Sequence, residues 1–165
     1  MKHLVISFMS PDRPGVVDSL ANLINQQNGN WQNSSMHHLS GYFAGAIEIA
    51  IAENATDELI TKIKAIPELE TIIKISDTSL TEQTPSIVLE LTANDRSGII
   101  QEITAIVHQQ GGNLLKLVST KASAPHTGQD LFKAKVTLTV NENEVDELIN
   151  TLENLADDLM VDISR

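Results

Sequence analysis

The fold is decided by the stretch Asp12-Arg13-Pro14-Gly15-Val16-Val17, which the chain repeats 83 residues later as Asp95-Arg96-Ser97-Gly98-Ile99-Ile100. An apolar run precedes each copy, from Leu4 to Met9 and from Ile87 to Thr92. A segment with the helical spacing of apolar residues follows each copy and closes in Gln-Gln-x-Gly-Asn. A strand, a turn with glycine at its corner and a helix therefore occur twice in one register. This pattern indicates a duplicated βα module.

The rest of each module also follows one order. Residues 30–39 and 42–52 have the pattern of two strands joined by a turn, a second helical pattern ends at Pro67, and residues 69–75 form a last strand. The second copy has six extra residues around 122–129, whose turn chemistry predicts a longer hairpin loop. We predict an α+β protein of two ferredoxin-like β-α-β-β-α-β modules. Each would be a four-stranded antiparallel sheet with both helices on one face.

The predicted boundaries follow the repeat. Module 1 spans residues 1–77, a polar linker spans 78–86, and module 2 spans 87–165. At the ends of the modules we align Ile75-Ser76 with Ile163-Ser164. Modules of about 80 residues bury modest cores, so another module or a second subunit usually covers them. We therefore expect a homodimer.

Charge and composition exclude several classes of protein. The chain has 22 acidic against 11 basic side chains, no basic cluster, and no cysteine. An acidic surface without a basic cluster argues against direct binding of DNA or RNA. Without cysteine there is no disulfide, thiol nucleophile or zinc ribbon, which fits a reducing compartment. No apolar run approaches the length of a membrane span, and the start lacks a signal-peptide pattern. We expect a cytoplasmic protein without a membrane partner.

The modules resemble a known family. A β-α-β-β-α-β unit of this length, with Asp-Arg-Pro-Gly-Val at the first turn and Gly-Asn opening the second strand, is similar to the ACT domain. This resemblance implies small, commonly paired regulatory modules that bind amino acids at the interface between modules. Two such modules and little else resemble the layout of the glycine cleavage system transcriptional repressor family. That layout implies a regulator without a DNA-binding domain, which senses a small amino acid and acts through a DNA-binding regulator protein.

The two repeated turns are the predicted ligand sites, with glycine or serine as the favoured ligand. A helix N-terminus presents N–H donors to a carboxylate, and glycine lets the ligand come close to that backbone. Aspartate side chains or turn carbonyls can accept hydrogen bonds from the ammonium. Because Ser97 stands where the family pattern has proline, module 1 is the better candidate. The candidate residues are Asp12, Arg13, Pro14, Gly15, Val16, Asn30, Asp95, Arg96, Ser97, Gly98, Ile99 and Asn113.

The same residues also have a structural interpretation. Asp12 is well placed to accept N–H groups at the helix start, and Pro14 suits the first helical position. Arg13 and Arg96 can pair with the neighbouring aspartates, and the glycines can serve a positive φ. The alternative function is a ligand-free adaptor or oligomerisation module that regulates an enzyme or transporter. The histidines lack metal-ligand spacing and no catalytic motif occurs, so we expect no enzyme, no cofactor and no metal.

Overall fold

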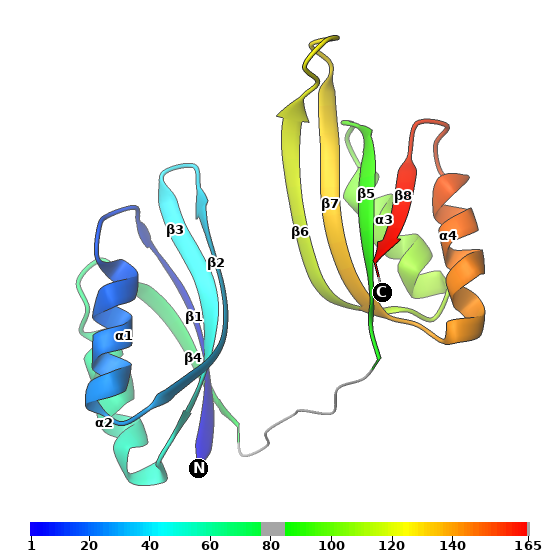
Figure 1. The fold of residues 1–165 in the computed structure, drawn as a ribbon. Coiled ribbons are helices and arrows are strands. Elements are labelled where there is room, and N and C mark those ends of the chain that lie inside the picture. Colours follow the sequence, from blue (N-terminus) through cyan, green and yellow to red (C-terminus); the bar gives the residue numbers. More distant parts are fainter. Residues whose placement is uncertain (77–84, 165) are drawn as a thin grey trace. The chain divides into compact units, whose positions relative to one another are not determined.

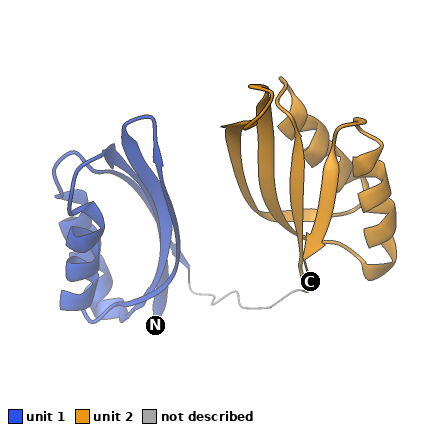
Figure 2. Ribbon diagram, turned by 45° about the horizontal axis from the view of Figure 1, so that its top comes forward, with its two compact units in different colours: residues 1–81 blue, residues 82–165 orange. Residues whose placement is uncertain are grey.

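The computed structural model describes residues 1–76 and 85–164. The chain divides into two compact units, residues 1–81 (unit 1) and 82–165 (unit 2), shown in Figure 2. Unit 1 contains β1 (Lys2–Pro11), α1 (Val16–Gln26), β2 (Asn30–Leu39), β3 (Tyr42–Ile51), α2 (Glu53–Lys64) and β4 (Glu70–Ser76). Unit 2 contains β5 (Ile87–Asn94), α3 (Ile99–Gln109), β6 (Asn113–Ser123), β7 (Asp130–Thr139), the 3-10 turn η1 (Glu142–Glu144), α4 (Val145–Glu153) and β8 (Met160–Ser164).

Each unit has one four-stranded sheet in which all neighbours are antiparallel. The strand orders are β2-β3-β1-β4 and β6-β7-β5-β8, so the first strand of each unit is central. Both helices of a unit lie on the same face of its sheet (Figure 1). The predicted pair of ferredoxin-like modules is confirmed.

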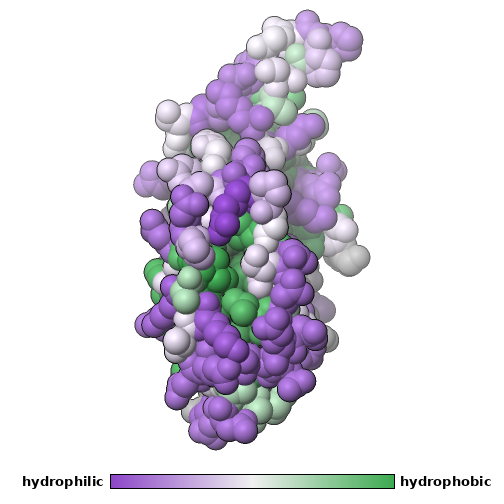
Figure 3. Space-filling model, turned by 90° about the vertical axis from the view of Figure 1, so that its left-hand side faces the viewer, coloured by the Kyte–Doolittle hydropathy of each residue, from purple (hydrophilic) through white to green (hydrophobic). Residues whose placement is uncertain are grey.

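Along the central strand β1 of unit 1, side chains alternate between the buried core and the open face of the sheet. Leu4, Ile6 and Phe8 are buried beneath the helices, whereas Val5 and Met9 lie about half exposed on the opposite, open face. The helices add apolar stripes at helical spacing. These buried helical residues are Val16, Leu20, Ile24, Leu59 and Ile63. Outward from them, hydrophilic residues cover most of the helical side of unit 1, with a hydrophobic patch near its middle (Figure 3).

Unit 2 has its own core, built in the same way. The pairing of β8 with β5 in this unit corrects the predicted alignment of the two modules at their ends. Ile163 pairs with Leu89 in the sheet, whereas Ile75 pairs with Leu4. Leu89 is the repeat partner of Ile6, which pairs with Ile73. Ile163 therefore corresponds to Ile73, and the sequence alignment of Ile75 with Ile163 was wrong by two positions. The connection before the last strand is one residue longer in unit 2, which shifts the register of the repeat.

The predicted insertion is confirmed at the β6–β7 hairpin. Residues 124–129 form its loop, and the strands on either side continue one pair further, Ser123 with Asp130, than in unit 1. The proposed linker 78–86 falls mostly on residues 77–84, outside the described residues, so its bounds stay a prediction. No helix in the described part of the chain is long and apolar enough to cross a membrane.

Candidate functional site

Both repeated turns end in a glycine that forms the N-cap of the following helix. Gly15 has φ 87° and Gly98 has φ 85°, a left-handed conformation that favours glycine, as predicted. Because α1 begins at Val16, Pro14 lies in the turn and not at the first helical position. Among the described residues no side chain caps α1 or α3, so Asp12 does not cap α1. Both structural predictions fail because glycine occupies the cap.

The uncapped helix starts face two hollows in the surface. In unit 1 the hollow is about 230 Å³, and in unit 2 about 720 Å³. A helix of this length leaves its first N–H groups without partners inside the helix, and they carry the positive end of its dipole. A glycine cap has no side chain to satisfy them. The hollow of unit 1 is lined by Asp12, Arg13, Gly15, Val16, Val17, Asp18 and Phe43. The hollow of unit 2 is lined by Asp95, Arg96, Gly98, Ile99 and Phe132, together with further residues of α3 and β6.

Each turn is fastened to the neighbouring hairpin. The Asp12 N–H donates to the Gly41 carbonyl at 2.9 Å, and the Asp95 N–H donates to the Asp130 carbonyl at 2.9 Å. The hairpin ends of β2–β3 and β6–β7 therefore lie beside the turns. This arrangement brings side chains from the edge strands β2 and β6 to the turn aspartates.

The two turn aspartates have different partners on those edge strands. In unit 1, His38 Nε2 lies 3.3 Å from Asp12 Oδ2. In unit 2, Lys121 Nζ lies 3.1 Å from Asp95 Oδ2 and 2.7 Å from Asp130 Oδ2. Hydrogen bonds to Asp130 and Asp95 raise the pKa of Lys121, and the hydrogen bond to Lys121 lowers the pKa of Asp130. Sequence reasoning missed both partners, although the offset of 83 aligns His38 with Lys121.

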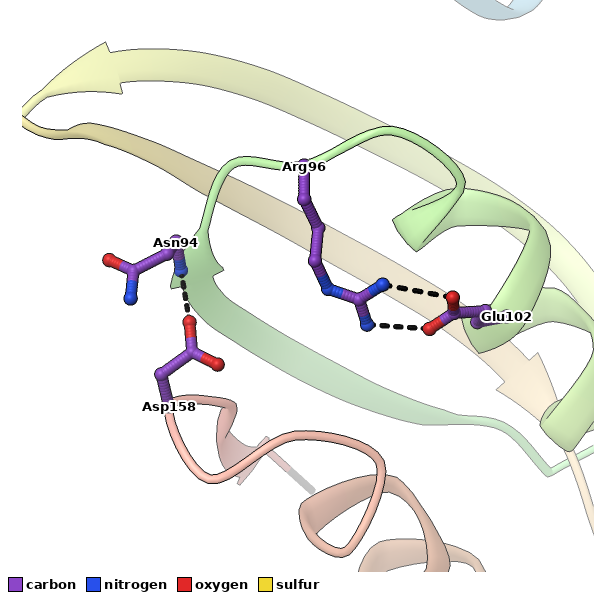
Figure 4. Close-up of polar contacts among 4 residues, drawn as sticks. All are labelled: Asn94, Arg96, Glu102 and Asp158. Carbon is purple, nitrogen blue, oxygen red and sulfur yellow. Dashed lines mark hydrogen bonds and ion pairs between the residues drawn. The ribbon is translucent and has the colours of Figure 1, made fainter.

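The structural interpretation expected Arg13 and Arg96 to pair with the neighbouring aspartates, but both have other partners. Arg13 Nη2 donates to the Pro67 carbonyl at 2.8 Å and ties the turn to the chain after α2. Arg96 forms a bidentate pair with Glu102 on α3, with N–O distances of 2.9 and 2.5 Å (Figure 4). Their hydrogen bonds lower the pKa of Glu102 and raise that of Arg96.

Comparison with known proteins places the first unit in a family. The profile of the ACT domain matches residues 2–74. The first unit is an ACT domain. Unit 2 has the same strand order and the same glycine-capped turn, so the chain is a tandem of ACT-like folds.

Two solved structures share this tandem arrangement over nearly their whole length. A protein of unknown function from Galdieria sulphuraria has a TM-score of 0.80 at 20% identity, covering 99% of this chain and 98% of its own. A candidate glycine cleavage system transcriptional repressor has a TM-score of 0.71 at 18% identity, covering 99% and 96%. At these identities the likeness shows the fold. No curated protein matches the chain.

The ACT fold separates the two predicted asparagines from the turns. Asn30 is level with Ala50 and His3 at the start of β1, whereas the turn follows Pro11 at the other end. Eight residues of strand at about 3.3 Å each make this separation roughly 26 Å. Asn113 opens β6 in the same way. The remaining candidates lie in or beside the turns.

Proposed function

We propose that this chain is a non-catalytic regulator that binds a small amino acid, glycine or serine, at its glycine-capped turns. The observation that carries the proposal is the uncapped start of α1 beside the hollow at Gly15. There the N–H groups of the first helical turn can receive a carboxylate, helped by the helix dipole. Asp12, about half exposed, supplies an acceptor for the ammonium.

The walls of the unit 1 hollow favour a small ligand. Val16, Val17 and Phe43 line it with apolar surface, and its volume of about 230 Å³ makes it the smaller of the two hollows beside the turns. The smaller hollow suits the smaller amino acids, glycine and serine.

A thermal-shift screen of the twenty amino acids tests the sensor. We expect glycine, serine or both to raise the melting temperature, since a ligand that binds only the folded state stabilises it by mass action. Larger amino acids should give smaller shifts. A flat screen would reject the sensor and leave the adaptor.

We propose further that the chain acts in transcriptional regulation through a DNA-binding protein and does not bind DNA itself. Its 22 acidic side chains against 11 basic ones would repel a phosphate backbone. We expect no gel shift of promoter DNA by the purified chain, even at low salt, where electrostatic binding is strongest. A specific shift without any partner protein would contradict this.

The adaptor remains the second candidate because of the open sheet face of unit 1. Val5, Met9 and Ile72 are exposed there, and Met9 and Ile72 line a hollow together with Ala44 and Ala46. Exposed apolar side chains that gather on one face are typical of protein contacts. An adaptor would use this face and need no ligand, so the amino-acid screen separates the two functions.

A further inference from the structure

We infer that Lys121 fills in unit 2 the place that the ammonium of an amino acid takes in unit 1, so that the chain binds one amino acid and binds it in unit 1. The inference rests on the proposed function and adds which of the two sites works. It starts from the difference between the two turn aspartates.

In unit 2 the acceptor for an ammonium is already occupied. Lys121 Nζ bridges Asp95 at 3.1 Å and Asp130 at 2.7 Å, so two carboxylates hold one ammonium group. The Asp95 side chain is only 29% exposed, compared with 52% for Asp12. The raised pKa of Lys121, caused by its hydrogen bonds to both carboxylates, keeps it charged. This built-in cation has the charge and the donors that a ligand ammonium would bring.

In unit 1 the corresponding position holds no permanent cation. His38 takes the place of Lys121, so Asp12 faces one imidazole nitrogen where Asp95 faces a lysine ammonium. The second carboxylate is also missing, because the residue whose carbonyl accepts from the turn N–H is Gly41 in unit 1 and Asp130 in unit 2. A single imidazole nitrogen at 3.3 Å from one carboxylate oxygen holds Asp12 less firmly than Lys121, which contacts two carboxylates at 3.1 and 2.7 Å, holds Asp95. An incoming ammonium can therefore take its place.

A ligand entering unit 2 would meet a different electrostatic environment. The ligand ammonium would have to displace Lys121 or lie beside it, and two ammonium groups side by side repel each other. Arg96, which lines the same hollow, is likewise held by its bidentate bond to Glu102 and is not free to clamp the carboxylate. The unit 2 hollow is larger, but both of its cations are already paired. Its size therefore does not make it the better site.

The exchange of the two edge-strand residues tests the inference by calorimetric titration with glycine and, separately, with serine. We expect the unchanged chain to bind one ligand per chain. Lys121→His should create a second site, and His38→Lys should weaken the first at least tenfold, which corresponds to about 1.4 kcal/mol. The double exchange should keep one site and move it to unit 2, where Asp95→Asn would then remove it.

Lys135→His is the matched control. Lys135 is 61% exposed, close to the 59% of Lys121, and pairs with Glu90 at 3.6 Å on the open face of the same sheet. It should leave one site with unchanged affinity. All four positions are exposed enough for the variants to fold, and thermal unfolding checks this.

The outcomes separate the two proposals. Two equal sites in the unchanged chain, or a single site that Lys121→His leaves single, would overturn the inference and keep the proposed function. Unchanged affinity in His38→Lys would also overturn it. Absence of binding in every variant would overturn the proposed function together with the inference.

Discussion

Gly15→Ala is expected to leave unit 1 folded and to weaken glycine or serine binding by about tenfold to a hundredfold. A Cβ built at Gly15 meets no described atom within 4 Å, so the added methyl group causes no clash. Its cost is the strain of φ 87° in alanine, about 1–2 kcal/mol. A folded domain with about 5–15 kcal/mol of stability survives that loss. The chain should keep its fold and lose the site.

The loss of binding follows from where the methyl group lies. Gly15 lines the hollow beside the start of α1, so its Cβ would occupy space through which a carboxylate approaches the first N–H groups. Charge-assisted hydrogen bonds of this kind contribute about 1.5–3 kcal/mol each. One lost bond therefore corresponds to roughly a tenfold to hundredfold weaker affinity.

Calorimetric titration decides this prediction, with fluorescence of Trp31 as the check on folding. Trp31, the only tryptophan of the chain, packs against the core of unit 1. Gly128→Ala is the control, because it has φ 66° and open space around its Cβ but lies in the β6–β7 loop. Gly98→Ala should leave the affinity unchanged, because Gly98 caps α3 in unit 2, which is inferred not to bind the ligand. Unchanged affinity in a folded Gly15→Ala variant would mean that the corner only builds the fold.

The architecture was predictable because it depends on patterns that occur twice. The period of the apolar residues assigns strands and helices, and the repeat of the Gly15 turn at Gly98 fixes the module. The order of strands in the sheet then follows, because a β-α-β-β-α-β sequence of elements allows only a few connections between strands. Because these patterns involve many residues, no single residue could make the prediction of the fold wrong.

The geometry of the candidate site was predicted only in part, because its details depend on single contacts. The turn itself was found, but Asn30 was assigned to it although a βαβ unit puts the start of the second strand at the far end of the helix. Topology alone could have excluded that residue. The choice of Pro67 as the partner of Arg13 is different, because a partly exposed arginine selects among surface acceptors whose energies differ by less than about 1 kcal/mol. No local sequence pattern encodes that choice.

Gly45→Ala is expected to destabilise unit 1 by about 1–3 kcal/mol, the usual cost of overpacking a core. Gly45 lies in β3 between Phe8 of β1 and Met36 of β2. A Cβ at this position would lie 2.5 Å from the Ser35 carbonyl oxygen and 2.8 Å from Met36 Cγ. The first neighbour is backbone, so the strands themselves must move apart. For a unit of this size, each kcal/mol lowers the melting temperature by roughly 4–8 °C.

Unit 2 shows how the same position accepts a side chain. Its equivalent residue, Ala134, pairs with Leu91 and Ser119, both smaller than the Phe8 and Met36 of unit 1. The missing Cβ of Gly45 therefore compensates for larger residues on both neighbouring strands. Unit 1 combines a glycine on the middle strand with two large neighbours, whereas unit 2 combines an alanine with two smaller ones.

A double-mutant cycle with Met36→Ser, the residue that unit 2 carries, tests this compensation. Met36→Ser alone should lower stability, because Met36 packs against the core. Combined with Gly45→Ala it should cost less than the sum, with a coupling of about 0.5–3 kcal/mol, as for residues in contact. Recovery should be incomplete, since the Ser35 carbonyl stays in place. Denaturant unfolding followed by Trp31 fluorescence reports on unit 1, and simple additivity would show that Met36 does not restrict this position.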